Sequence, residues 1–256
     1  MSTTFGDKTS DQVTLATTAP CSACKAIGVP CALEAHATSI RTRRDQSLPL
    51  GLDGGETVFI VRSGVLMLEL ALPAGQRQIV GIFYPGDLLR SSFAPPHTGA
   101  AFVTAAPGEV WRLRLTGLET LAAGDPAVRR YLDEAVSTRI ARQALHAVTL
   151  GQFDCEQKVA TLLLEFALRI GTRSGGGAVF ELPFDRQHIA DFLGLNPDTL
   201  SRIMSRFTAG GLIARSQRNR VVVRDLSTLA ARSPVAGPLL EVGVTRRCTA
   251  SLGAAL

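Results

Sequence analysis

The stretch that decides the fold lies in the second half of the chain, where residues 185–207 read DRQHIADFLGLNPDTLSRIMSRF. The first part predicts a short helix that ends at Gly194. Pro197 then opens a second helix, at the position where its missing N–H costs nothing. One side of this second helix is apolar at steps of three and four residues, and consists of Leu200, Ile203, Met204 and Phe207. Two helices joined by a short glycine-containing turn predict a helix-turn-helix.

The other side of the second helix is polar and has the residue types that read DNA. A major groove admits one helix, and only its first two turns reach the base edges. Arg202 can donate two hydrogen bonds to guanine, Asp198 can accept one from cytosine, and Ser201 can lie against thymine. Thr199 shares this polar side, and Arg206, one turn later, is better placed for a phosphate.

A basic hairpin is predicted after the second helix, over residues 212–215 and 220–224. Such a hairpin makes a winged variant of the motif, with Arg218 and Arg220 aimed at the DNA backbone. Residues 173–224 hold eight arginines against four acidic residues, a surplus of four in a chain whose net charge is +5. This concentration favours a polyanionic partner, although a solvated basic face on an ordinary three-helix module is the alternative.

The first half of the chain predicts short strands separated by glycine and proline turns. Residues 57–61 lead into Arg62-Ser63-Gly64, which we interpret as a break before a second strand over residues 65–72. Further strands are expected at residues 78–83 and 109–115. This spacing is typical of an antiparallel barrel or sandwich.

A long helix is expected between the two halves. Asp125-Pro126 is typical of a helix start, and residues 128–150 contain neither glycine nor proline. The apolar stripe is narrow and rich in small residues, which favours a dimer seam over burial within one chain. The seam residues are Leu132, Val136, Ile140 and Ala147.

Composition excludes several classes of protein. The chain has 256 residues, 46% of them hydrophobic and 19% charged, which excludes wholesale disorder. No apolar run approaches the roughly 18–20 residues that a membrane span needs. We also expect no secretory signal, so the predicted location is the cytoplasm. No phosphate-binding glycine loop, nucleophile elbow or metal-hydrolase histidine pair is present, so we expect no enzyme.

Three cysteines are grouped near the start of the chain, as Cys21-x2-Cys24-x6-Cys31. In a cytoplasmic protein this spacing favours a metal or a cluster over disulfides. The alternatives are an iron–sulfur cluster, a zinc site or thiol redox sensor, and a relic without metal. Cys155 and Cys248 stand apart, and Cys248 is the weaker candidate for a ligand.

The order of these parts resembles the FNR/CRP family of bacterial transcription regulators. That likeness implies an α+β fold: an N-terminal double-stranded beta-roll like that of cyclic-nucleotide-binding proteins, a long dimerisation helix and a C-terminal winged helix-turn-helix. The implied division is a tail with the cysteine group (1–36), the roll (37–124), the dimerisation helix (125–150), the DNA-binding domain (151–228) and a C-terminal tail (229–256).

The most specific resemblance is Asp198-Thr199-Leu200-Ser201-Arg202, which is similar to the Glu-Thr-x-Ser-Arg signature of the FNR/FixK branch. It implies a homodimer that reads a TTGAT-type palindrome in double-stranded DNA and contacts RNA polymerase. Asp198 is one methylene shorter than the family's glutamate, which changes its reach to the base. Oxygen sensors of the family carry an aspartate on the dimer helix. Gln143 aligns there, which implies dimers that persist without a cluster.

The resemblance also bears on cofactors. In the FNR branch a similar cysteine triplet holds an oxygen-sensitive 4Fe–4S cluster, which needs four ligands. The family's fourth cysteine aligns with Trp111, so Cys155, His36, an acidic residue or a small molecule would have to replace it. Residues 86–96 lack the Glu and the later Arg of the cyclic-nucleotide cassette, so we expect no cyclic AMP. The histidines are scattered, so haem is not expected either. A cluster-free FixK-like regulator with idle cysteines, or one that responds to haem or NO, is the alternative.

Overall fold

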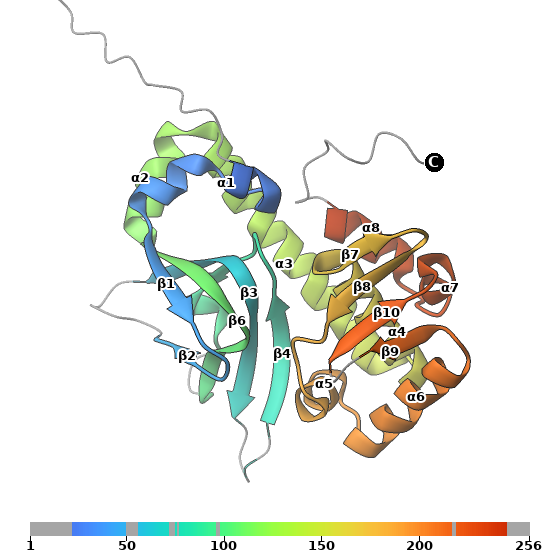
Figure 1. The fold of residues 1–256 in the computed structure, drawn as a ribbon. Helices are drawn as coiled ribbons and strands as arrows, with labels where there is room; N and C mark the ends of the chain where they lie inside the picture. Colours follow the sequence, from blue (N-terminus) through green and yellow to red (C-terminus); the bar gives the residue numbers. More distant parts are fainter. Residues whose placement is uncertain are drawn as a thin grey trace, which may run out of the picture.

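The structure, a computed structural model, describes residues 22–49, 56–71, 75, 77–95, 98–216 and 219–244. Figure 1 shows a strand-rich half and a helix-rich half that lie on either side of one long helix, α3 (Pro126–Gln152). The α+β fold class is therefore confirmed. The predicted site residues Cys21 and Arg218, together with Cys248, lie outside the described residues.

The strand-rich half is an antiparallel sheet that curls around an apolar interior. Its strands run in the order β1 (Thr38–Thr42), β6 (Ala100–Arg114), β3 (Thr57–Ala71) and β4 (Arg77–Phe83). Two short strands complete it, because β2 (Ser47–Leu48) pairs with β6, and β5 (Leu88–Arg90) pairs with β3. The buried interior includes Phe59, Val61, Leu66, Phe83 and Phe102. The predicted antiparallel architecture is confirmed.

The predicted break at Arg62-Ser63-Gly64 is wrong, because β3 runs through it as one strand of 15 residues. Its register against β6 shifts between Val61 and Val65, which indicates a bulge rather than a turn. Gly64 makes the bulge feasible: its φ is 82°, and a Cβ there would lie 2.6 Å from the carbonyl oxygen of Ala106.

The segment predicted as an N-terminal tail is part of the core from Ser22 onward. Helix α1 (Ser22–Ile27) and a 3-10 turn, η1 (Cys31–His36), pack on the roll, where Cys24 and Leu33 are fully buried. Helix α2 (Leu115–Gly124), which was not predicted, follows β6 and joins the same cluster.

The helix-rich half begins with α4 (Cys155–Arg169), which a capping box at Asp154 starts. A four-stranded sheet follows it in the order β7 (Thr172–Ser174), β8 (Gly177–Glu181), β10 (Arg220–Val223) and β9 (Ile213–Ser216). Residues 174–177 form the tight turn of the β7–β8 hairpin. The two helices α5 (Arg186–Leu193) and α6 (Pro197–Ala209) pack against α4 and each other.

Two further helices follow the second sheet: α7 (Leu226–Ala230) crosses the predicted boundary at residue 229, and α8 (Ala236–Val244) lies within the segment predicted as a C-terminal tail. Leu239 is buried against the core of this half, and the hydroxyls of Ser233 and Thr161 lie 2.9 Å apart. The chain after residue 229 therefore packs on the core of this half at least as far as Leu239. Among the described residues, no helix is long and apolar enough to cross a membrane.

Candidate nucleic-acid interface

Local capping positions the two helices α5 and α6. The Asp185 carboxylate accepts from the backbone N–H of His188 at 2.8 Å and starts α5. Gly194 ends that helix in the left-handed conformation, with φ 61° and ψ 43°. Asn196 then caps α6, its side-chain oxygen accepting from the N–H of Asp198 at 2.8 Å, and Pro197 is the first residue of the helix. Each of these signals is local, which is why the sequence predicted the turn correctly.

The two sides of α6 are arranged as predicted. Leu200, Ile203, Met204 and Phe207 are buried, whereas Asp198 and Arg202 are exposed. Thr199 and Ser201 are half-buried. The Ser201 hydroxyl donates to the carbonyl oxygen of Pro197 at 2.9 Å, so only its acceptor capacity is left for another partner. The polar edge is free to enter a groove, and DNA contact by each residue remains a prediction.

Arg206 lies one turn further along and pairs with α4. Its Nη2 is 2.7 Å from Oε1 of Glu156, and its side chain is 63% exposed. Exposed ion pairs of this kind contribute only about 0–1 kcal/mol, so a DNA phosphate can replace Glu156 at little cost.

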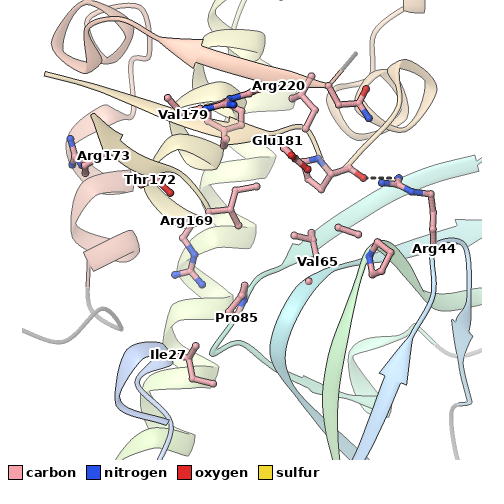
Figure 2. A pocket seen from close by; sticks show the side chains of 18 of the residues that line it. Ile27, Arg44, Val65, Pro85, Arg169, Thr172, Arg173, Val179, Glu181 and Arg220 are labelled. Atoms are coloured by element: carbon pink, nitrogen blue, oxygen red, sulfur yellow. Dashed lines mark hydrogen bonds between the residues drawn. The ribbon is translucent and has the colours of Figure 1, made fainter. Parts of the chain in front are cut away.

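The structure does not bring Arg220 to the same surface. Val221 and Val223 pack in the core that α6 shares, so Arg220, which precedes them, is directed to the other face of the sheet. There it lines a cleft of about 1190 Å³ between the two halves, together with Arg44, Arg173 and Glu181 (Figure 2). The prediction that Arg220 reaches the DNA backbone beside α6 is therefore not supported by its position, because strand alternation directs its side chain toward the roll.

Helix α5 is docked on the roll's edge strand β4. Nη2 of Arg77 lies 2.7 Å from the carboxylate of Asp191, and the side chain of Gln78 donates to the carbonyl oxygen of Asp191. The sequence analysis did not find this contact, which joins residues 114 positions apart.

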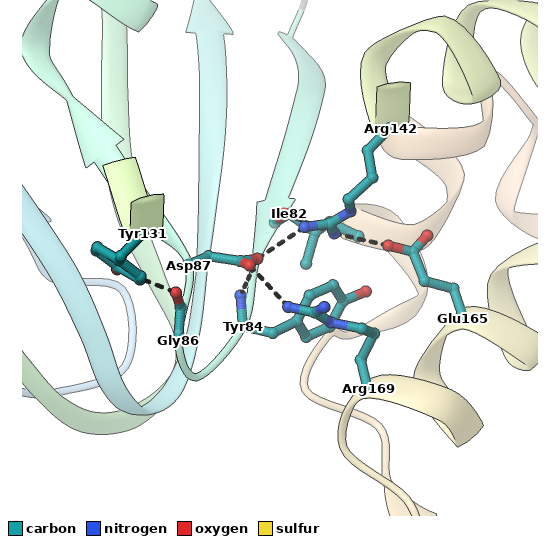
Figure 3. A network of polar contacts seen from close by, with 8 residues as sticks. All are labelled: Ile82, Tyr84, Gly86, Asp87, Tyr131, Arg142, Glu165 and Arg169. Atoms are coloured by element: carbon teal, nitrogen blue, oxygen red, sulfur yellow. Dashed lines mark hydrogen bonds and ion pairs between the residues drawn. The ribbon is translucent and has the colours of Figure 1, made fainter. Parts of the chain in front are cut away.

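A buried charge network joins the roll, α3 and α4 (Figure 3). Arg142 on α3 lies 2.7 Å from Asp87 on the roll and 2.7 Å from Glu165 on α4. Arg169 on α4 binds the other oxygen of Asp87 at 2.7 Å. All four side chains are at least four-fifths buried, and the two carboxylates raise the pKa of Arg142 above its ordinary value against the effect of burial. No local sequence pattern predicts this network.

Two of the predicted cysteines, Cys24 and Cys31, pack on the roll. The buried Cys24 thiol donates to Oε2 of Glu34 at 3.6 Å, and Glu34 also binds Arg62 at 3.0 Å. Arg62 stacks on Trp111 with its guanidinium 5.0 Å from the ring centre. Half-buried Cys31 and buried Trp111 belong to the same apolar cluster as Cys24.

The residues around Cys24 have part of the donor chemistry of an iron–sulfur site. Two thiols and a carboxylate, with Cys21 three residues before Cys24, have the chemistry of iron ligands. Among the described residues alone, no three candidate metal ligands form a group. Cys155 is exposed at the start of α4, beside the Glu156–Arg206 pair and in the other half of the molecule. Of the predicted substitutes for a fourth ligand, an acidic residue, Glu34, therefore lies beside Cys24, whereas Cys155 does not.

Among the predicted seam residues of α3, Leu132 packs on the apolar cluster that contains Cys24, whereas the others are exposed. Val136 and Ile140 are 37% and 62% exposed, and Gln143 and Ala147 are also exposed, whereas Leu132 is half-buried. This is an apolar stripe that one chain leaves uncovered.

Comparison with known proteins gave consistent matches. Residues 157–232 match the model of the Crp-like helix-turn-helix domain. The chain is 30% identical over 181 residues to the transcriptional regulatory protein btr of Bordetella pertussis, covering 70% of this chain and 74% of that protein. It is 32% identical over 170 residues to the nitrogen fixation regulation protein FixK of Bradyrhizobium diazoefficiens, covering 62% and 71%. The structure of FixK2 from Bradyrhizobium japonicum superimposes with a TM-score of 0.65 at 28% identity, covering 77% of this chain and 97% of that one.

Proposed function

The chain belongs to the FNR/CRP family of DNA-binding transcription regulators, and on this premise we propose that it is a cytoplasmic, homodimeric activator that reads a TTGAT-type palindrome and contacts RNA polymerase. Its relatives are regulators and not enzymes, as predicted. One observation carries the proposal: α6 is anchored by four buried apolar side chains and presents Asp198 and Arg202 to solvent.

Base reading follows from this geometry. Arg202 donates its fork of N–H groups to a guanine, and the shorter Asp198 accepts from a cytosine amino group. Pairing of two α3 helices through Val136 and Ile140 would set the two α6 helices about 34 Å apart, one turn of DNA.

A binding assay tests this proposal. The purified protein is titrated against a duplex that carries the TTGAT palindrome and against a scrambled duplex of equal length. Specific binding should exceed non-specific binding by a factor of about 10³ or more at physiological salt. Equal affinity for the two duplexes would refute the assigned palindrome.

We further propose that the cysteine group is the sensor of redox state or oxygen. Cys21, Cys24 and Cys31, with Glu34, would hold a 4Fe–4S cluster, which supplies an oxygen-labile centre when bound. Cys24 packs in one apolar cluster with Val128, Tyr131 and Ala135 at the start of α3. Tyr131 in turn donates to the carbonyl oxygen of Gly86, next to Asp87 of the charge network. A change of packing around Cys24 therefore acts on the dimerisation helix and on the junction between the two halves.

The alternative is a regulator without a cluster, of the FixK-like or the haem- or NO-responsive kind. In its favour, Trp111, which the family resemblance aligns with the fourth cysteine, is buried in the cluster of Cys24, and the Cys24 thiol already has a carboxylate partner. Anaerobic purification with a visible spectrum and iron and sulfide analysis distinguishes the two. A brown protein that bleaches in air supports the cluster, whereas a colourless, iron-free protein that binds DNA supports the alternative.

A further inference from the structure

Three buried arginines meet two buried carboxylates at the junction of the two halves. In the charge network Arg142 forms ion pairs with Asp87 and Glu165, and Arg169 forms one with Asp87. The nitrogen–oxygen distance is 2.7 Å in each pair. The third arginine, Arg139, is only 8% exposed, and its Nε and Nη2 have no hydrogen-bond partner among the described residues. The junction therefore carries one buried positive charge in excess.

The two unpartnered nitrogens of Arg139 form the side of a guanidinium that binds a carboxylate with two parallel hydrogen bonds. Arg90 shows this use within the same molecule: its Nε and Nη2 lie 3.0 and 2.7 Å from the two oxygens of Glu56. Arg139 instead stacks on Phe83, with its guanidinium 4.6 Å from the ring centre. Ring stacking holds the guanidinium in place but supplies no negative charge.

A cavity of about 40 Å³ lies beside Arg139, between the edge strand β4, α3 and the helices α4 and α5. His146, two turns further along α3, also lines it and stacks on Phe192 at 4.0 Å. Its buried Nε2 likewise has no partner among the described residues. A water needs roughly 10–15 Å³ of such space, so the cavity has room for a small ion.

We propose that this cavity binds a small, planar, monovalent anion with two oxygens, of the formate, nitrite or bicarbonate class, through Arg139 and His146. Burial lowers the pKa of His146 to about 4, so at neutral pH the imidazole is uncharged and offers an N–H donor rather than a second cation. The anion neutralises the excess charge, which a water molecule does not do.

Thermal unfolding of the full chain in sodium formate tests the site, at constant ionic strength. The wild-type midpoint should rise saturably, by about 3–5 °C at ten times the dissociation constant. Arg139→Met keeps the length of the side chain but removes its charge, and should show no saturable rise. Arg129→Met changes an exposed arginine on the same helix and should respond like the wild type.

An equal rise in the wild type and in R139M, or no saturable rise in the wild type, would overturn the proposal and leave the cavity to water. If R139M does not fold, line broadening of carbon-13 formate by the wild type and by His146→Phe replaces it. Broadening that H146F weakens several-fold supports the site. Equal broadening, or none, refutes it.

Discussion

The helices α6 and α3 are opposite in the way they use their apolar residues. α6 buries Leu200 and Ile203 and exposes Arg202, as a helix does when its packing is complete within one chain. α3 buries Arg142, which binds Asp87 and Glu165 within the chain, and exposes Ile140 and Val136. A helix that buries charge and exposes apolar side chains has its polar partners in the same chain and its apolar partner elsewhere. The contrast supports a second copy of the chain as the cover for α3.

The largest expected effect comes from breaking the buried side of α3. Arg142→Met leaves Asp87 and Glu165 buried with one cation fewer. Removal of one partner from a buried pair costs about 3–5 kcal/mol, so urea unfolding should show a loss of this size. Arg130→Met, at an exposed position on the same helix, should cost less than about 0.5 kcal/mol. Similar losses of unfolding free energy in both variants would show that the charge network does not stabilise the fold.

The exposed side of α3 gives the second effect. Ile140→Asp places two carboxylates in the seam of the proposed dimer, where each loses its hydration. The dimer should weaken by about 3 kcal/mol, or more than a hundredfold in dissociation constant, as measured by analytical ultracentrifugation. Ile140→Val should leave the dimer nearly intact. A monomeric wild type would refute the proposed dimer. An I140D variant that dimerises normally would show that the dimer forms through another surface.

The pH at which His146 takes up a proton tests whether water is excluded from the buried side of α3. Burial and the nearby cations Arg139, Arg142 and Lys158 lower its pKa from 6.5 to about 4, against the opposing effect of Glu165. Between these values the unfolded chain binds a proton that the folded chain does not, so this group makes stability fall as the pH falls from 6.5 to 4. The free energy of unfolding should fall by roughly 2–3 kcal/mol between pH 6.5 and 4 because of this group. The variant His146→Phe should lack this part of the pH dependence. A pH profile unchanged by H146F would show that the imidazole is hydrated.

The same contrast explains what the sequence could and could not predict. The α5–α6 turn depends on Asp185, Gly194 and Asn196, which act on their immediate neighbours, so pattern and propensity sufficed. The partners in the charge network lie 23 to 82 residues apart, and nothing local marks Arg142 as buried. The Gly64 bulge was misread as a turn because glycine permits both.

Base reading by α6 has a smaller expected effect. Arg202→Ala should cost about 1–3 kcal/mol in binding to the palindrome and relax one base position. Fluorescence anisotropy with single-base variants of the duplex measures both. Fold stability should not change, because Arg202 is exposed, and thermal unfolding provides that control. A variant that keeps full selectivity at every position would remove Arg202 from the reading set.

The smallest effect is expected at Arg206, whose side chain binds Glu156 in the free protein and is proposed to bind a phosphate in the DNA complex. Its pair with Glu156 is exposed, so Arg206→Ala should change stability by less than about 1 kcal/mol. If Arg206 leaves Glu156 for a phosphate, the variant should weaken binding to all duplexes alike and lower the salt slope by about one. Glu156→Gln frees Arg206 without removing it and should strengthen binding slightly. A selective loss at one base in R206A would instead place Arg206 with Arg202 among the residues that read the sequence, and α6 would then enter the groove by one more turn.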